Sequence, residues 1–173
     1  MIRLEELTGH HNRKALDCGV PALNQWLRQT ALQHQKKGLS RTLVATPADA
    51  TAAAIFQERG YAGVDTSTIL GFYCLAAGLV QLEDLPAELA RRYPRQIPVT
   101  RLGRLAVEQS LQGQGLGQLL LVDAINRARG AAQIVGSAGI VVDAKDAPAA
   151  GFYRRYGFVP CDDRPLKLYL PLW

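Results

Sequence analysis

The sequence lacks the usual features of membrane, secreted and disulfide-rich proteins. It contains no run of about 18 apolar residues, so we expect no membrane span. Residues 1–6 lack the long apolar stretch of a signal peptide, which favours a cytoplasmic location. The 3 cysteines, Cys18, Cys74 and Cys161, are few and widely spaced, which favours small, partly buried side chains over a disulfide framework.

Metal-ligand patterns and strong net charge are also missing. The 3 histidines, His10, His11 and His34, have no ligand-like spacing with Cys, Asp or Glu, so we expect no metal site. The net charge of +5 permits an anionic partner without demanding one. With 173 residues, 48% of them apolar, the chain has the size and composition of one folded domain, residues 1–173.

Alternating strand and helix patterns predict an α/β domain with a central sheet. The expected helices cover residues 20–36, 85–93, 116–129 and 147–157. The expected strands cover residues 41–46, 69–76, 99–108 and 139–143, with the last strands at 159 and 166–170. The helix at 116–129 has only a narrow polar stripe, so we expect it to be packed on most sides.

A segment at residues 47–66, rich in Ala, Thr and Gly, departs from this alternation and is a probable insert. A helix start at Thr46 and Pro47, with Asp49 in the first turn and a stop at Gly60, predicts a short helix within it.

The sharpest local signal is a glycine-rich loop between the strand at 99–108 and the helix at 116–129. Its residues are Gln112, Gly113, Gln114, Gly115, Leu116, Gly117 and Gln118. Glycines let successive N–H groups turn toward one point, and the following helix adds unpaired donors and a positive dipole end. Gln118 stands where a Walker loop needs lysine and a dinucleotide loop needs glycine, so both patterns fail. A pyrophosphate site and a plain tight turn both fit the loop alone.

The spacing of Gln112, Gly115 and Gly117 resembles the coenzyme A loop of the GNAT acetyltransferase superfamily. Upstream, Leu105, Ala106 and Val107 resemble the family's bulged strand, and Phe152, Tyr153, Gly157 and Phe158 resemble its second signature. The resemblance implies a mixed sheet flanked by helices, with splayed central strands that hold acetyl-CoA. It implies that the loop, residues 105–107 and Phe152 bind the cofactor, and that Tyr153 is the general acid beside the CoA sulfur. The bland alternative is that Tyr153 only packs under the sheet.

Further segments resemble one branch of this superfamily, the acetyltransferase toxins of bacterial type II toxin–antitoxin modules. They are Asp17-Cys18-Gly19, Leu23-Asn24-Gln25-Trp26-Leu27, Ala31 with Gln35, Ser40-Arg41-Thr42, Gly71-Phe72-Tyr73-Cys74-Leu75, Leu102-Gly103-Arg104-Leu105-Ala106-Val107 and Val142-Asp143-Ala144-Lys145-Asp146. The branch implies acetylation of the α-amino group on charged tRNA, which blocks translation. It also implies a ribbon-helix-helix antitoxin and a homodimer.

A tRNA substrate needs cationic contacts, and each candidate is equally well explained as a solvated surface charge. The candidates are Lys36, Lys37, Arg41, Arg91, Arg92, Arg95, Arg154 and Arg155. Two other readings stay open. One is a GNAT enzyme that acts on a protein N-terminus, a lysine or a small-molecule amine, and the other is a non-catalytic protein that binds CoA or forms a repressor complex.

Overall fold

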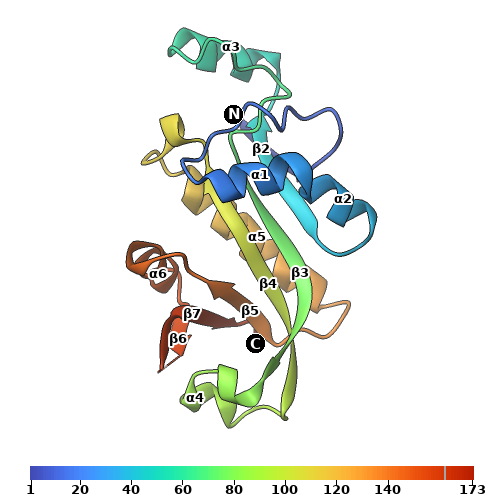
Figure 1. Cartoon of the computed structure of the whole chain (residues 1–173), viewed down its shortest axis with the longest axis vertical. Coiled ribbons are helices and arrows are strands. Elements are labelled where there is room, and N and C mark those ends of the chain that lie inside the picture. The colour runs from blue at the N-terminus through green and yellow to red at the C-terminus, as the bar shows by residue number, and fades with distance from the viewer. Residues whose placement is uncertain (162) are drawn as a thin grey trace. The chain divides into compact units, whose positions relative to one another are not determined.

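The computed structural model describes residues 1–161 and 163–173. Within them, strands form one mixed sheet in the hydrogen-bonded order β1-β2-β3-β4-β5-β7-β6. The strands are β1 (Ile2–Glu6), β2 (Arg41–Pro47), β3 (Gly71–Gln81), β4 (Gln96–Val107), β5 (Gly139–Asp143), β6 (Val159–Cys161) and β7 (Arg164–Pro171) (Figure 1). The helices are α1 (Pro21–Gln29), α2 (Ala31–Lys36), α3 (Ala50–Glu58), α4 (Ala87–Ala90), α5 (Leu116–Ala132) and α6 (Ala147–Arg154), with short 3₁₀ helices η1 (Leu82–Asp84) and η2 (Gln109–Leu111). The predicted α/β class is confirmed.

The chain forms two compact units, each built from two segments. The first unit consists of residues 1–74 and 104–124, and the second of residues 75–103 and 125–173. Three long elements, β3, β4 and α5, contribute a stretch to each unit.

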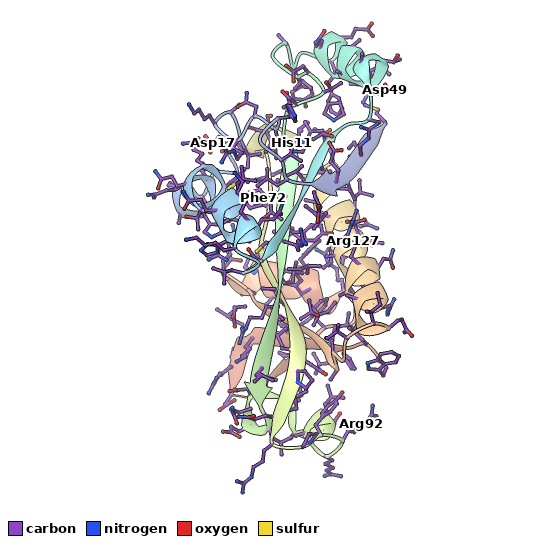
Figure 2. All side chains as sticks on the ribbon, turned by 90° about the vertical axis from the view of Figure 1, so that its right-hand side faces the viewer. His11, Asp17, Asp49, Phe72, Arg92 and Arg127 are labelled. Carbon is purple, nitrogen blue, oxygen red and sulfur yellow. The ribbon has the colours of Figure 1, made fainter. Side chains whose placement is uncertain are left out.

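In the first unit, β1 pairs antiparallel with β2, and α1 and α2 cover one face of the strands. Phe72 of β3 is fully buried under α1 with Leu27 and Val44 (Figure 2). Neighbouring strand residues point to opposite faces, so Tyr73 faces the other way. Its hydroxyl donates a 2.5 Å hydrogen bond to Asp123 of α5. Both faces of β3 in this unit are therefore covered by helix.

In the second unit, β4 pairs parallel with β5 from Thr100 and Ile140 to Leu102 and Val142. β7 pairs antiparallel with β5 on its other side, and the short β6 pairs with β7. Apolar side chains of β3, β4, β5 and β7 form the core of this unit, and they include Val80, Val99, Val141 and Tyr169.

The predicted helix at 20–36 is wrong as a single element, because Thr30 leaves the helical region at φ −121° and separates α1 from α2. The change of direction places Gln35 of α2 against the strands. Its amide nitrogen donates to the Leu7 carbonyl at 2.8 Å, and its amide oxygen accepts from the Thr42 N–H at 2.9 Å. These two bonds tie α2 to β2 and to Leu7, the residue that follows β1.

The inserted helix exists, but its start differs from the prediction. Thr46 and Pro47 end β2, and Asp49 is the N-cap of α3 rather than a first-turn residue (Figure 2). Its carboxylate accepts the Ala52 N–H at 2.8 Å. Gly60, at φ +101°, follows the helix as expected.

The expectation that α5 is packed on most sides is wrong. Its buried residues follow one helical stripe, whereas Leu119 and Val122 are 40% and 41% exposed. The three cysteines are buried, and none of these described residues forms a disulfide. No helix among the described residues is long and apolar enough to cross a membrane.

Candidate functional site: the glycine-rich loop and Tyr153

The glycine-rich loop connects η2 to α5 within the first unit. Gly113 and Gly115 have φ angles of +81° and +86°, which L side chains rarely adopt. An added Cβ would meet no protein atom within 4 Å at either position, so the space beside the loop is open. Leu116 begins α5, whose first-turn N–H groups have no partner within the helix. This combination suits an anion such as a pyrophosphate.

Gln112 anchors the loop to its surroundings. Its side-chain amide donates to the Cys18 carbonyl and to the Val107 carbonyl, both at 3.1 Å. The side chain of Gln112 thus holds the start of the loop against two backbone segments.

Asp17 fixes the segment before α1 against η2, a role that the sequence pattern alone does not reveal. Its carboxylate accepts from the Gly19 N–H at 2.9 Å, the Asn24 amide at 3.0 Å and the Gln109 amide at 3.1 Å. The Gly19 hydrogen bond is the main reason that the pKa of Asp17 is lowered. Cys18, whose carbonyl accepts the hydrogen bond from Gln112, is the residue after Asp17. The hydrogen bonds of Asp17 therefore position the loop.

Residues 105–107 of β4 lie beyond the last position at which β4 pairs with β5, Leu102 and Val142. Ala106 packs into the core of the first unit. Just before this run, Arg104 has φ +57°, the one positive φ among the described non-glycine residues. A single left-handed residue therefore interrupts the regular strand geometry just before residues 105–107.

Arg104 stacks on an aromatic pair. Its guanidinium carbon lies 4.4 Å from the centroid of the Trp26 ring, which itself stacks on Phe72 at 6.3 Å with 11° between the planes. The side chain of Arg104 is exposed and forms no ion pair with any described carboxylate. Cation and indole therefore hold each other in place at an exposed position.

In the second unit, α6 positions Tyr153. Asp146 caps the helix by accepting the Ala149 N–H at 2.9 Å, and Pro148 lies in the first turn. Tyr153 is 7% exposed and packs edge-to-face against Phe152 and Phe158 at 5.3 and 5.5 Å.

The Tyr153 hydroxyl forms no hydrogen bond with any other described residue. Burial raises the pKa of Tyr153 to about 12, so the hydroxyl stays protonated at physiological pH. A buried phenol without an internal partner suits a proton donor to a bound molecule. Phe152 is half-buried and also contacts Tyr156 at 5.4 Å, in line with a packing role for that second tyrosine.

The predicted tRNA-contacting cations are all exposed and fall in separate groups. Lys36, Lys37 and Arg41 belong to the first unit, where Arg41 pairs with Glu6 at 3.0 Å. Arg91, Arg92 and Arg95 follow α4, and Arg154 and Arg155 end α6, in the second unit (Figure 2).

Sequence reasoning missed a further cationic group in the first unit. Arg13, Lys14 and Arg28 line an open cavity of about 590 Å³ together with His11. His11 is buried, and its Nε2 lies 2.9 Å from a Glu5 carboxylate oxygen. The adjacent pair Arg13 and Lys14 is the signal that could have found this group, but Arg28 joins it only through folding.

Comparisons with known proteins give a consistent result. A family model described as an acetyltransferase (GNAT) domain matches residues 72–160. The tRNA-acetylating toxin of Mycobacterium tuberculosis is 37% identical over 152 residues, which cover 88% of this chain and 81% of that toxin. The solved structure of AtaT complexed with acetyl-methionyl-tRNAfMet matches with a TM-score of 0.82 at 27% identity, over 99% of this chain and 95% of that one. A tyrosine-to-phenylalanine mutant of AtaT, bound to the C-terminus of the antitoxin AtaR and acetyl-CoA, matches with a TM-score of 0.74 at 27% identity, over 99% and 94% of the two chains.

The family match includes β4, the glycine-rich loop and Tyr153, the parts whose geometry suits an acetyl-CoA reaction. The chain therefore belongs to the GNAT acetyltransferase family and is an acetyl-CoA-dependent N-acetyltransferase.

Proposed function

We propose that this enzyme is a toxin that acetylates the α-amino group of the aminoacyl residue on charged tRNA and thereby blocks translation. The similarity to a tRNA-acetylating toxin supports this substrate. Among the residues of the chain, the stacked Arg104 is the one that favours charged tRNA over other amines as the acceptor.

Acetyl-CoA supplies an acetyl group activated as a thioester. The backbone of the loop residues Gly113 to Gly117 and the dipole of α5 hold its pyrophosphate, with Gln112, Gln114 and Gln118 alongside. The backbone of residues 105–107 pairs with the pantetheine arm and polarises the thioester carbonyl, while Phe152 contacts the cofactor.

The acceptor amine attacks as the neutral base. A free α-amino group has a pKa of about 7.7–8.0, so a useful fraction is neutral near pH 7.4 without a dedicated base. The new C–N bond forms as the C–S bond breaks, and one amine proton must reach the sulfur.

Tyr153 is the proposed carrier of that proton. With its pKa at about 12, the phenol is a much weaker acid than a thiol, whose pKa is about 8.5. It therefore donates to the departing sulfur as it accepts a proton from the attacking nitrogen, and it carries no lasting negative charge.

The positive charge of Arg104 favours an acceptor that carries negative charge. It immediately precedes residues 105–107, where the acetyl group is proposed to bind, and its stacked guanidinium has no described carboxylate partner. A cation held there repels a polyamine or a lysine-rich peptide. It attracts the phosphates next to the aminoacyl ester at the 3′ end of tRNA.

The direct test mixes the protein with labelled acetyl-CoA and bulk charged tRNA, with deacylated tRNA as the control. We expect label on charged tRNA alone. Label on another amine but none on charged tRNA would contradict the proposed substrate. Tight CoA binding without transfer to any amine would contradict it as well.

Replacing Arg104 by asparagine should lower kcat/KM for charged tRNA by about tenfold or more, because one charge-assisted phosphate contact is lost. Asparagine tolerates a positive φ, so the backbone is preserved. The measurement is kcat/KM against salt concentration, where the slope of the log–log plot should become shallower by about one. Arg129→Asn, which removes an exposed arginine of α5, is the control. An unchanged slope in Arg104→Asn would contradict the phosphate contact.

The remaining proposals concern partners and location. The exposed cations of both units, together with Arg13, Lys14 and Arg28, are candidates for contacts to tRNA phosphates. We further propose a ribbon-helix-helix antitoxin, a homodimer and a cytoplasmic location. The similarity to AtaT, which is bound to the antitoxin AtaR, supports an antitoxin partner.

A further inference from the structure

The insert at residues 47–66 borders the glycine-rich loop. Tyr61 follows α3, and its hydroxyl donates to the Ser110 carbonyl of η2 at 3.3 Å. The Gln114 side-chain amide in turn donates to the Tyr61 hydroxyl at 3.4 Å. All three residues belong to the first unit, so the insert is attached to the segment that is proposed to hold the pyrophosphate.

Between the insert and the loop lies a cavity of about 250 Å³. Phe56 and Arg59 line it from the insert, and Gln114, Gly115 and Leu116 line it from the loop and the start of α5. The rest of its wall is formed by apolar side chains, including those of β1. Gln114, Gly115 and Leu116 therefore belong both to the glycine-rich loop and to the wall of the cavity.

Arg59 is the cation of this cavity. It is exposed and forms no ion pair with any described carboxylate. Arg59 is also the C-cap of α3, so the backbone at this residue is fixed by the end of the helix. The aromatic rings of Phe56 and Tyr61 pack edge-to-face at 6.1 Å beside it. The cavity thus combines an apolar wall with one unneutralised guanidinium.

This combination matches one end of acetyl-CoA. On the side of its pyrophosphate away from the pantetheine arm, CoA carries an adenosine with a 3′-phosphate. An apolar wall suits the flat base, and a guanidinium binds a phosphate through paired N–H donors. Because Gly115 and Leu116 belong both to the pyrophosphate loop and to the cavity, the adenosine needs no further element to reach it.

We propose that the insert builds a subsite for the 3′-phosphoadenosine end of acetyl-CoA, with Arg59 binding the 3′-phosphate. The subsite depends on the use of acetyl-CoA and is independent of the identity of the acceptor. It gives residues 47–66 a role in cofactor affinity.

The test compares CoA with dephospho-CoA, which lacks only the 3′-phosphate, by isothermal titration calorimetry. The wild-type protein should bind CoA about tenfold or more tightly than dephospho-CoA, the range expected of one charge-assisted contact. Arg59→Gln should lose most of this preference by weakening CoA binding, with dephospho-CoA affinity nearly unchanged. Arg129→Gln should keep the full preference.

Each outcome of this comparison is decisive. A preference that survives in Arg59→Gln, or a wild-type protein that does not distinguish the two ligands, would overturn the assignment of the 3′-phosphate to Arg59. If Arg59→Gln lowers the affinities for CoA and dephospho-CoA equally, the loop itself is damaged, and this result would also overturn the assignment. Because the readout is binding without transfer, the result stands whether or not charged tRNA proves to be the acceptor.

Discussion

Replacing Tyr153 by phenylalanine should lower kcat by about a hundredfold or more, the usual contribution of a positioned proton donor. The ring still packs against Phe152 and Phe158, so the melting temperature and acetyl-CoA affinity should stay close to wild type. Only the hydroxyl is removed, and it has no hydrogen-bond partner among the described residues whose loss would destabilise the fold. Single-turnover transfer of labelled acetyl groups measures the chemical step.

The pH dependence separates the two proposed proton-handling groups. Because burial raises the pKa of Tyr153 to about 12, its hydroxyl stays protonated across the accessible range. The wild-type kcat/KM should therefore rise with pH as the acceptor amine loses its proton, at about pH 7.7–8.0, and then level off. A decrease in kcat/KM with rising pH that begins below pH 9 and is absent in Tyr153→Phe would contradict the role of Tyr153 as a protonated donor.

Tyr156→Phe is the matched control for Tyr153→Phe. Tyr156 lies on the other flank of Phe152, at 5.4 Å, and is assigned only to packing. We expect near wild-type kcat. Equal losses in Tyr156→Phe and Tyr153→Phe would show that the aromatic cluster, rather than the Tyr153 hydroxyl, limits the reaction.

Replacing Gly115 by alanine should weaken acetyl-CoA binding by about tenfold to a hundredfold. At φ +86°, an L residue shifts the backbone to relieve strain, which turns N–H donors away from the proposed pyrophosphate position. Each lost charge-assisted bond contributes about 1.5–3 kcal/mol. Calorimetric titration with acetyl-CoA measures the change.

Gly38→Ala separates cofactor loss from backbone strain. Gly38 has φ +76° and equally open surroundings, but it follows α2 and lies outside the loop. Both alanine variants should lose roughly 1 kcal/mol of stability from the unfavourable conformation. Only Gly115→Ala should lose affinity for acetyl-CoA. Unchanged affinity in Gly115→Ala would contradict the assignment of the pyrophosphate to this loop.

Local chemistry explains why much of the site is predictable from sequence. The glycine spacing predicts a tight loop, and Gly113 and Gly115 adopt the positive φ angles that residues without a Cβ favour. The helix that carries Tyr153 is bounded by a capping aspartate, an early proline and Gly157 at φ +95°, all of which act over a few residues.

The features that escape prediction depend on contacts between distant segments. Strand β1 carries Arg3, Glu5 and Glu6 within five residues, and it becomes a strand because β2 offers it an edge. Arg104 takes a left-handed conformation although Gly103 precedes it, and its stacking partner Trp26 lies far away in sequence. No local rule indicates that choice.

The cavity near Arg59 escapes prediction for the same reason. Its walls come from β1, α3 and the start of α5, so it exists only after these segments have assembled. The sequence pattern identifies residues 47–66 as a departure from the family, whereas the folded chain places them beside the loop.

The most direct test of the proposed activity is the mass of the 3′-terminal aminoacyl-adenosine released by nuclease from charged tRNA after reaction with acetyl-CoA. We expect an increase by one acetyl group, located on the α-amino nitrogen by fragmentation and strongly reduced at the same early reaction time with Tyr153→Phe. An unmodified aminoacyl-adenosine, or an acetyl group on the nucleotide, would contradict the central claim.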